Sequence, residues 1–165
     1  MKYRIAIRED LNKIIQLKNK VKVHNKEIQL DIWQNGYPFD DMIAEDIKKG
    51  HARIIEDENQ NIIAFTSFEN SNEAYPNENL PLNYMTFSRF MVDCDIHNQG
   101  IGTFFIQQLI AEAKAKNQSG LFITVDFFND SAIHLYKKMG FYKVGTIRIP
   151  QAKFILDSYQ LKFTK

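Results

Sequence analysis

Two glycines, Gly100 and Gly102, stand where an apolar stretch ends and a helical pattern begins. A helix that starts at such a turn leaves its first N–H groups unpaired, and the positive end of its dipole faces outward. These properties favour an anion site, and a pyrophosphate is the obvious anion. The alternative is that the glycines only ease a tight turn between a strand and a helix. The glycines alone do not separate the two interpretations.

Two well-known phosphate-binding motifs do not fit this turn. A P-loop needs four residues between its glycines, followed by Lys and then Ser or Thr, and this sequence has no such run. A dinucleotide-binding fingerprint needs a third glycine where this chain has Phe105. Neither motif therefore predicts binding of ATP or NAD here.

Tyr136 is a second candidate for chemistry, and it lies in a segment with its own helix signals. Asn129–Ser131 offer side chains that can cap a helix N-terminus, and Gly140 suits the left-handed position that ends a helix. The inner stripe of this helix would consist of Ala132, Leu135, Tyr136 and Met139. A phenol on such a stripe can donate a proton, or it can be an ordinary core residue.

The elements that must position these residues run from Tyr84 to Phe141. A strand is predicted over Tyr84 to Val92, a turn over 97–103, a second strand over Leu121 to Val125, and the helix with Tyr136 after it. The helix that opens on the glycines has apolar residues at three- and four-residue spacing: Ile101, Phe104, Phe105, Ile106, Leu109, Ile110 and Ala113.

The order and spacing of these features resemble the GNAT superfamily of N-acetyltransferases, which use acetyl-coenzyme A. Val92 lies six residues before Asn98–Thr103, and Asn129, Tyr136 and Gly140-Phe141 follow as in the family's two central motifs. One position departs from the family pattern, because His97 stands where Gln or Arg usually begins the glycine motif. Backbone amides do most of the phosphate binding, so we expect binding to survive this change.

The resemblance implies an α/β fold with a mixed, mostly antiparallel sheet and helices on both faces. The strands ending at Val92 and Val125 would run parallel and splay apart. Main-chain groups of Phe90, Met91 and Val92 would then pair with pantetheine amides like an extra strand. The amides of Asn98, Gln99, Gly100, Ile101, Gly102 and Thr103 would hold the pyrophosphate, and the thioester would point toward Asn129 and Tyr136.

The resemblance also implies direct attack by a primary amine on the acetyl carbonyl, with Tyr136 as proton donor to the departing thiolate. The general base is open, because Thr86 and Thr124 occupy positions where family members often carry glutamate. Asp126 lies on the same strand face as Thr124 and is the leading substitute. A water chain to Glu69 or to another carboxylate is equally arguable.

The acceptor side is predicted from the region between the first two helices, which lies over the acceptor end of the cleft in GNAT proteins. Resemblance places Trp33 and Tyr37 there, although both could instead plug the edge of the core. The stretch 69–82 reads as a long loop, and its three glutamates could favour a cationic amine or simply be solvated.

The remaining elements complete one expected N-acetyltransferase domain over residues 1–165. Strands are predicted from Lys2 to Arg8, in a hairpin over 51–56 and 61–68, and over 141–149 and 154–163, with Pro150 at the last boundary. Helices are predicted over 11–27, capped by Asp10, and over 39–49, ended by Gly50.

Composition limits the partners and the compartment. A net charge of +1 gives no electrostatic case for nucleic acid or a membrane, and no apolar run has membrane-spanning length. The single cysteine, Cys94, rules out an internal disulfide and favours a reducing cytoplasm. Acidic residues on both sides of Cys94 should raise its pKa. The four histidines and Cys94 lack metal-ligand spacing, so we expect no metal.

These observations favour an acetyl-coenzyme A-dependent N-acetyltransferase that acts on a small-molecule amine. A protein or peptide acetyltransferase is one alternative, and a GNAT-fold module that binds coenzyme A without turnover is another. The sequence does not identify the acceptor, the use of longer acyl groups, or the oligomeric state, for which a homodimer stays open.

Overall fold

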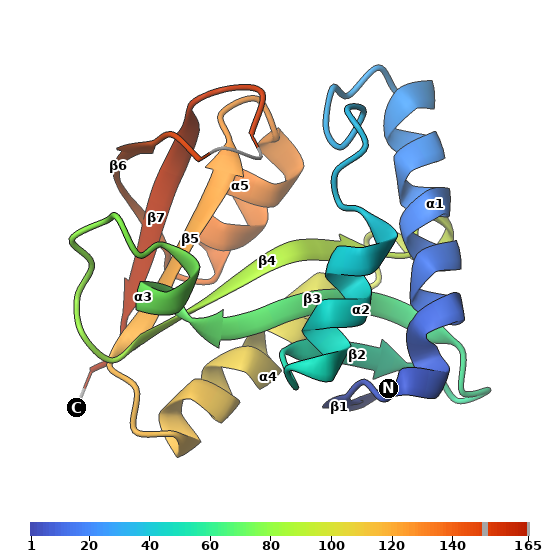
Figure 1. Cartoon of the computed structure of the whole chain (residues 1–165), viewed down its shortest axis with the longest axis horizontal. Coiled ribbons are helices and arrows are strands. Elements are labelled where there is room, and N and C mark those ends of the chain that lie inside the picture. The colour runs from blue at the N-terminus through green and yellow to red at the C-terminus, as the bar shows by residue number, and fades with distance from the viewer. Residues whose placement is uncertain (150–151, 165) are drawn as a thin grey trace. The chain divides into compact units, whose positions relative to one another are not determined.

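Seven strands form one mixed sheet in the order β1-β2-β3-β4-β5-β7-β6 in the computed structural model, which describes residues 1–149 and 152–164 (Figure 1). The strands are β1 Lys2–Ile5, β2 Ala52–Glu56, β3 Ile62–Asn70, β4 Tyr84–Val92, β5 Gly120–Asp126, β6 Tyr142–Ile147 and β7 Leu156–Lys162. The helices are α1 Leu11–Glu27, α2 Asp40–Lys48, α3 Ser71–Ala74, α4 Ile101–Ala115 and α5 Asp130–Lys138, with short 3-10 turns η1 Arg8–Asp10 and η2 Cys94–Ile96. The predicted fold class is confirmed.

The parallel pair at the centre of the sheet is short. β4 and β5 pair only at Tyr84 with Gly120 and at Met85 with Leu121, and the two strands then diverge. β5 pairs with β7 along its whole length, from Gly120 with Lys162 to Asp126 with Leu156. The predicted splay between the parallel strands is therefore confirmed.

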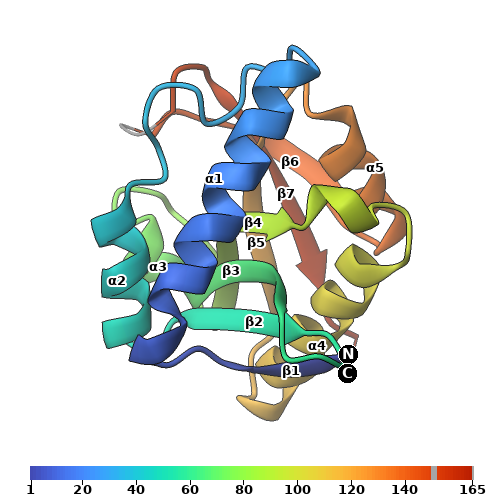
Figure 2. The ribbon, with the colours of Figure 1, turned by 90° about the vertical axis from the view of Figure 1, so that its right-hand side faces the viewer.

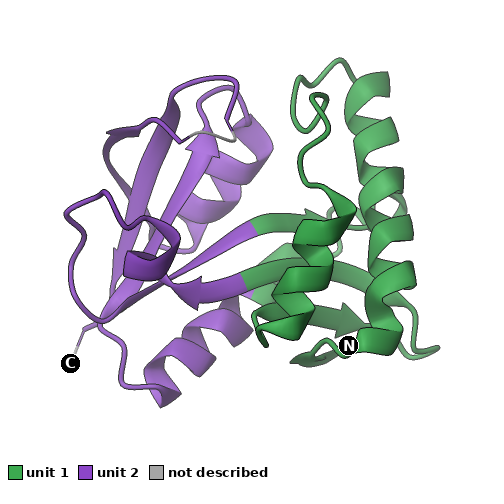
Figure 3. Ribbon diagram, in the orientation of Figure 1, with its two compact units in different colours: residues 1–67, 89–105 green, residues 68–88, 106–165 purple. Residues whose placement is uncertain are grey.

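The chain divides into two compact units, and each is described by itself (Figure 3). Unit 1 comprises residues 1–67 and 89–105, and unit 2 comprises residues 68–88 and 106–165. In unit 1, α1 and α2 lie side by side along β1, β2 and β3 (Figure 2). Their apolar faces enclose a core of Ala6, Ile14, Leu17, Ile43, Ala52, Ile54, Ile62, Phe65 and Met91.

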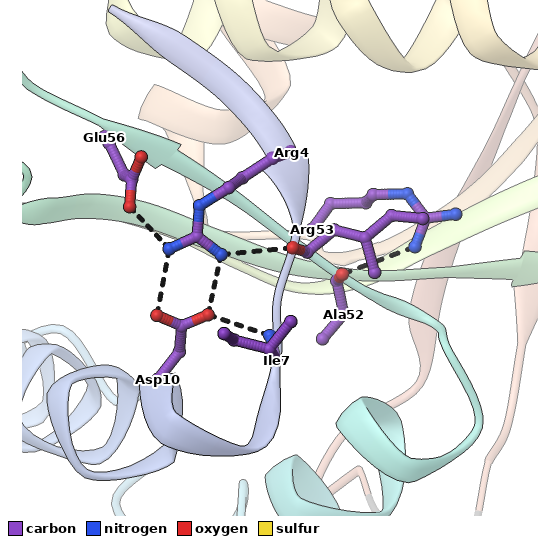
Figure 4. A network of polar contacts seen from close by, with 7 residues as sticks. Arg4, Ile7, Asp10, Ala52, Arg53 and Glu56 are labelled. Atoms are coloured by element: carbon purple, nitrogen blue, oxygen red, sulfur yellow. Dashed lines mark hydrogen bonds and ion pairs between the residues drawn. The ribbon is translucent and has the colours of Figure 1, made fainter.

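Arg4 links three elements at the start of unit 1 (Figure 4). Its guanidinium donates to both carboxylate oxygens of Asp10, at 2.7 and 2.9 Å, and to Glu56 on β2 at 2.5 Å. The same Asp10 carboxylate accepts from the backbone N–H of Ile7 at 2.8 Å. The prediction that the Asp10 side chain caps α1 is wrong, because Arg4 and Ile7 take up its oxygens.

The stretch 69–82 is not a loop throughout, because β3 continues to Asn70 and Ser71–Ala74 form α3. Asn70 starts this helix by accepting a hydrogen bond from the N–H of Asn72 at 2.9 Å, a local side-chain cap.

The expected boundary at Pro150 lies outside the described residues. Among the helices of the described ranges, none is both long and apolar enough to cross a membrane.

Candidate functional site

The end of β4 in unit 1 contains a break in the strand conformation at Arg89. Its φ of 53° lies in the left-handed region, which is uncommon for a residue with a side chain. The Arg89 guanidinium donates to both oxygens of Asp46, at 2.8 and 2.7 Å, and to the Tyr37 hydroxyl at 3.2 Å. The Ser67 hydroxyl donates to the same carboxylate at 3.1 Å. This network holds the strand directly before Phe90, Met91 and Val92.

The Arg89–Asp46 pair is well shielded from water, since the two side chains are only 10% and 8% exposed. Burial by itself would lower the pKa of the guanidinium, but Tyr37 and Asp46 outweigh it and leave the pKa above its ordinary value. Arg89 is thus a fixed positive charge. The sequence analysis missed it because a lone arginine in an apolar strand carries no motif.

The segment that precedes the glycine turn of unit 1 is held by contacts to β3 and α1. The N–H of Asp93 donates to the carbonyl of Ile63 on β3 at 2.8 Å. Lys20 of α1 makes ion pairs with Asp93 and Asp95, each at 2.5 Å. The segment between Val92 and the turn is therefore anchored to both a strand and a helix.

The turn itself is exposed from His97 to Gly100 and leads into α4 at Ile101. Asn98 and Gly100 both have left-handed backbones, with φ of 62° and 78°. A Cβ built on Gly100 would meet no atom within 4 Å, so open space adjoins the first turn of α4. Exposed N–H groups at a helix start with space beside them fit a phosphate group. The role of Asn98, Gln99, Gly100, Ile101, Gly102 and Thr103 in holding the pyrophosphate stays a prediction.

In unit 2, Tyr136 lies on α5 and is 6% exposed. Its ring makes an edge contact with Phe87 of β4, with ring centres 5.7 Å apart. Burial raises the pKa of the phenol well above its ordinary value, and Tyr75 adds to this shift. Tyr136 is therefore protonated at neutral pH, as an ordinary tyrosine also is.

Asn129 starts the helix that carries Tyr136. Its side-chain oxygen accepts a hydrogen bond from the N–H of Ala132 at 3.3 Å, as the capping signals predicted. Gly140 follows the helix with φ of 94°, the left-handed conformation expected at its end. The local sequence thus determines where the helix that carries Tyr136 begins and ends.

Tyr75, which the sequence analysis did not single out, brings a second phenol to unit 2. It follows α3, and its hydroxyl lies 3.1 Å from the Thr124 hydroxyl on β5. Its ring packs edge-on against Phe122, with ring centres 5.3 Å apart. No periodic pattern marks this residue, because it lies in an irregular stretch beside Pro76.

Asp126 is the last residue of β5 and is half-buried. It lies two residues after Thr124, so the two side chains share one face of the strand. In unit 1, Trp33 packs against the hydrophobic core and has φ of 60°. Tyr37, by contrast, directs its hydroxyl to Arg89.

The other candidate chemistry in unit 1 centres on Cys94. Burial is the main cause of its raised pKa, and the neighbouring Asp93 and Asp95 raise it further, so the predicted direction is confirmed. These three residues have potential ligand atoms within 4.8 Å of one another. Lys20 makes ion pairs with both carboxylates and so offsets one of their two negative charges.

Comparison with solved structures shows a full-length match. An acetyltransferase of the GNAT family from Streptococcus agalactiae 2603 has 21% identity and a TM-score of 0.83, covering 99% of this chain and 96% of that one. The ribosomal-protein-alanine N-acetyltransferase from Brucella melitensis has 20% identity and a TM-score of 0.74, covering 99% and 100%. An N-acetyltransferase from Staphylococcus aureus Mu50 has 26% identity and a TM-score of 0.72, covering 98% and 97%.

No curated protein sequence matches the chain. A family model does match, over residues 22–141, and its description is acetyltransferase (GNAT) family. This range includes the end of β4, the glycine turn, β5 and the helix with Tyr136. With the structural matches above, it shows that the chain belongs to the GNAT family of acetyl-coenzyme A-dependent acetyltransferases.

Proposed function

We propose that this protein transfers the acetyl group of acetyl-coenzyme A to a primary amine of a small molecule by direct attack. The observation that carries the proposal is Tyr136, a buried phenol on α5 that is protonated at neutral pH and whose ring contacts Phe87 of β4. We further propose that residues 1–165 act as one N-acetyltransferase domain. A small acceptor follows from the expectation that the aromatic residues Trp33 and Tyr37 line its pocket; the Tyr37 hydroxyl accepts a hydrogen bond from Arg89.

The residues divide into binding and proton-handling groups. Acetyl-coenzyme A supplies the activated acetyl thioester. Main-chain groups of Phe90–Val92 would pair with the pantetheine amides, and N–H groups of Asn98–Thr103 would hold the phosphates. The fixed Arg89 backbone orients the first of these segments. Asn129 positions the start of α5.

Proton transfer falls to two residues of unit 2. An alkyl amine has a pKa of about 10, so at neutral pH it must lose a proton before it can attack. We assign this proton to the Asp126 carboxylate. Tyr136 then supplies a proton to the sulfur as the carbon–sulfur bond breaks, which prevents a free thiolate from accumulating.

Release of free thiol from acetyl-coenzyme A tests the proposal, with tyramine, spermidine, an aminoglycoside and a lysine-containing peptide as acceptors. We expect turnover with at least one of the small amines and little with the peptide. Preference for the peptide would support a protein acetyltransferase instead. Coenzyme A binding with no transfer to any amine would support a binding module.

A further inference from the structure

Thr86 of β4 has a hydroxyl group that is buried without a hydrogen bond. The residue is 1% exposed, and its Oγ1 has no hydrogen-bond partner among the described residues. A buried hydroxyl in this state destabilises a fold, because it loses its bonds to water and gains none. A valine of the same shape would avoid this cost, so the hydroxyl requires an explanation.

Two other hydroxyls share its face of the sheet within unit 2. Tyr84 and Phe122 belong to one hydrophobic cluster with Tyr75. Thr86 lies two residues after Tyr84 on β4, and Thr124 lies two residues after Phe122 on β5, so both threonines share the face of this cluster. The Tyr75 ring packs on Phe122 while its hydroxyl reaches Thr124. Tyr75, Thr86 and Thr124 therefore present three hydroxyls to one side.

The sheet opens at this point. The last pair between β4 and β5 joins Met85 to Leu121, and Thr86 is the next residue of β4. Neutral hydroxyls thus line the start of the gap between the two strands. Tyr136 reaches β4 at the adjacent residue, Phe87, on the other face.

We propose that the hydroxyls of Tyr75, Thr86 and Thr124 hold the acceptor's primary amine in its neutral form and orient its lone pair. This inference rests on the proposed function. A neutral amine has two N–H donors and one lone pair, and hydroxyl oxygens accept from those donors. Hydroxyls carry no negative charge, so they do not stabilise the ammonium form as a carboxylate would.

The proposed reaction begins with a proton transfer. The ammonium gives one proton to the Asp126 carboxylate, and the amine nitrogen forms a bond to the acetyl carbon. The carbon–sulfur bond breaks, and the sulfur takes the Tyr136 proton. The second proton leaves the nitrogen as the amide forms and passes through solvent to the Tyr136 phenolate, and Asp126 releases its proton to solvent, so both residues are restored. The three hydroxyls hold the nitrogen and are unchanged at the end.

Thr86→Val is the most direct test, because stability and activity should move in opposite directions. Loss of an unbonded buried hydroxyl should raise Tm. Loss of one hydrogen bond to the amine should lower kcat/KM for the acceptor about tenfold, with the KM for acetyl-coenzyme A unchanged. A lower Tm would mean that the hydroxyl is a bonded structural group, and unchanged kcat/KM would mean that it binds no amine. Either result overturns the proposal.

Tyr75→Phe tests the second hydroxyl, and Tyr84→Phe is its matched control. Both tyrosines are buried in the same cluster, but only Tyr75 bonds to Thr124. We expect Tyr75→Phe to lower kcat/KM for the acceptor about tenfold and Tyr84→Phe to leave it near the wild-type value. Equal effects of the two variants would assign Tyr75 to packing alone.

The assays use acetyl-coenzyme A with whichever of tyramine, spermidine or the aminoglycoside the wild type acetylates fastest. If the wild type acetylates none of them, hydrolysis of acetyl-coenzyme A is measured instead, since water can take the place of the amine. Absence of any acyl transfer by the wild type would refute the proposed function. Transfer that survives in both Thr86→Val and Tyr75→Phe would refute only the amine site.

Discussion

Tyr136 combines two properties that a proton donor needs. It lies buried beside the ring of Phe87, and its phenol is protonated at neutral pH. Burial alone also fits a packing role, because the α5 stripe would bury a tyrosine in either case. The hydroxyl group is what distinguishes the two roles.

Tyr136→Phe should reduce turnover by a hundredfold to ten-thousandfold, the usual contribution of general acid catalysis (about 10² to 10⁴). Affinity for acetyl-coenzyme A should change little, because the ring and the helix remain. Steady-state kinetics with free-thiol detection, together with calorimetry for binding, would measure both effects. Turnover within about threefold of wild type would mean that Tyr136 has only a packing role in the core.

Removal of Arg89 should destabilise unit 1, because it breaks a buried ion pair. Arg89→Met leaves Asp46 as a buried charge that keeps its hydrogen bond from Ser67 but loses both bonds from the guanidinium, and breaking a buried pair costs about 3–5 kcal/mol. Lys20→Met is the control, since the Lys20 side chain is 38% exposed and exposed ion pairs contribute about 0–1 kcal/mol. Urea unfolding would compare them, and similar losses would contradict the structural role assigned to Arg89.

At the scale of elements, the sequence predicts the glycine turn and the capped helix α5. The prediction of strand Tyr84 to Val92 matches β4, and Gly100 and Gly140 adopt the left-handed backbones that their positions suggested. Asn129 caps its helix as predicted. These features succeeded because the residues that determine them lie next to one another in the chain.

Contacts between residues far apart in the chain could not be predicted from neighbouring residues. Asp10 is expected to cap α1, but its carboxylate instead accepts from Arg4 of β1, which also donates to Glu56 of β2. Arg89 meets Asp46 across 43 residues of chain, and Tyr75 meets Thr124 across 49. No local pattern encodes such contacts, so the sequence predicted the helices and strands of the site better than its polar network.

The turn before α4 can be tested with a matched pair of glycines. Gly100 and Gly50 have φ of 78° and 72°, and a Cβ on either would meet no atom within 4 Å. Alanine at either position should therefore cost a similar amount of stability, about 1 kcal/mol, from backbone strain. Only Gly100→Ala should also weaken acetyl-coenzyme A binding, because its methyl group enters the space beside the turn. Isothermal titration would show this, and unchanged affinity would place the phosphates elsewhere.

For the whole molecule, ligand-induced stabilisation gives the broadest test of the binding proposal. Acetyl-coenzyme A at a hundredfold excess over its dissociation constant should add about 2.7 kcal/mol of stability. NAD and ATP should add much less, because the turn lacks their motifs. Thermal melts with each ligand at one concentration provide the measurement. An equal response to ATP would remove the support for a coenzyme A site.

The Arg4 network predicts how the fold responds to acid. Hydrogen bonds from Arg4 are the main cause that lowers the pKa of both Asp10 and Glu56 below their ordinary values. The resulting stabilisation is present above the unfolded carboxyl pKa of about 4 and is lost as pH falls through the lower folded values. The pKa of Arg4 is raised, so Arg4 stays charged throughout this range.

Arg4→Met should therefore be less stable than wild type at pH 7, and the difference should shrink below about pH 4. The loss at neutral pH should be about 3 kcal/mol, the lower end for a broken buried pair, because a quarter of the Arg4 side chain is exposed. Urea unfolding at several pH values would give both quantities. A difference that stays constant down to pH 3 would contradict the linkage.

The division into two units has a consequence for attempts to split the gene. The chain leaves unit 1 after Ser67, returns at Arg89, and leaves again after Phe105. These three crossings fall inside β3, β4 and α4 rather than in linkers. No single cut yields either unit as one continuous fragment. Fragment complementation would therefore have to divide the protein at a surface turn such as Asp57–Gln60, and the larger fragment would still carry segments of both units.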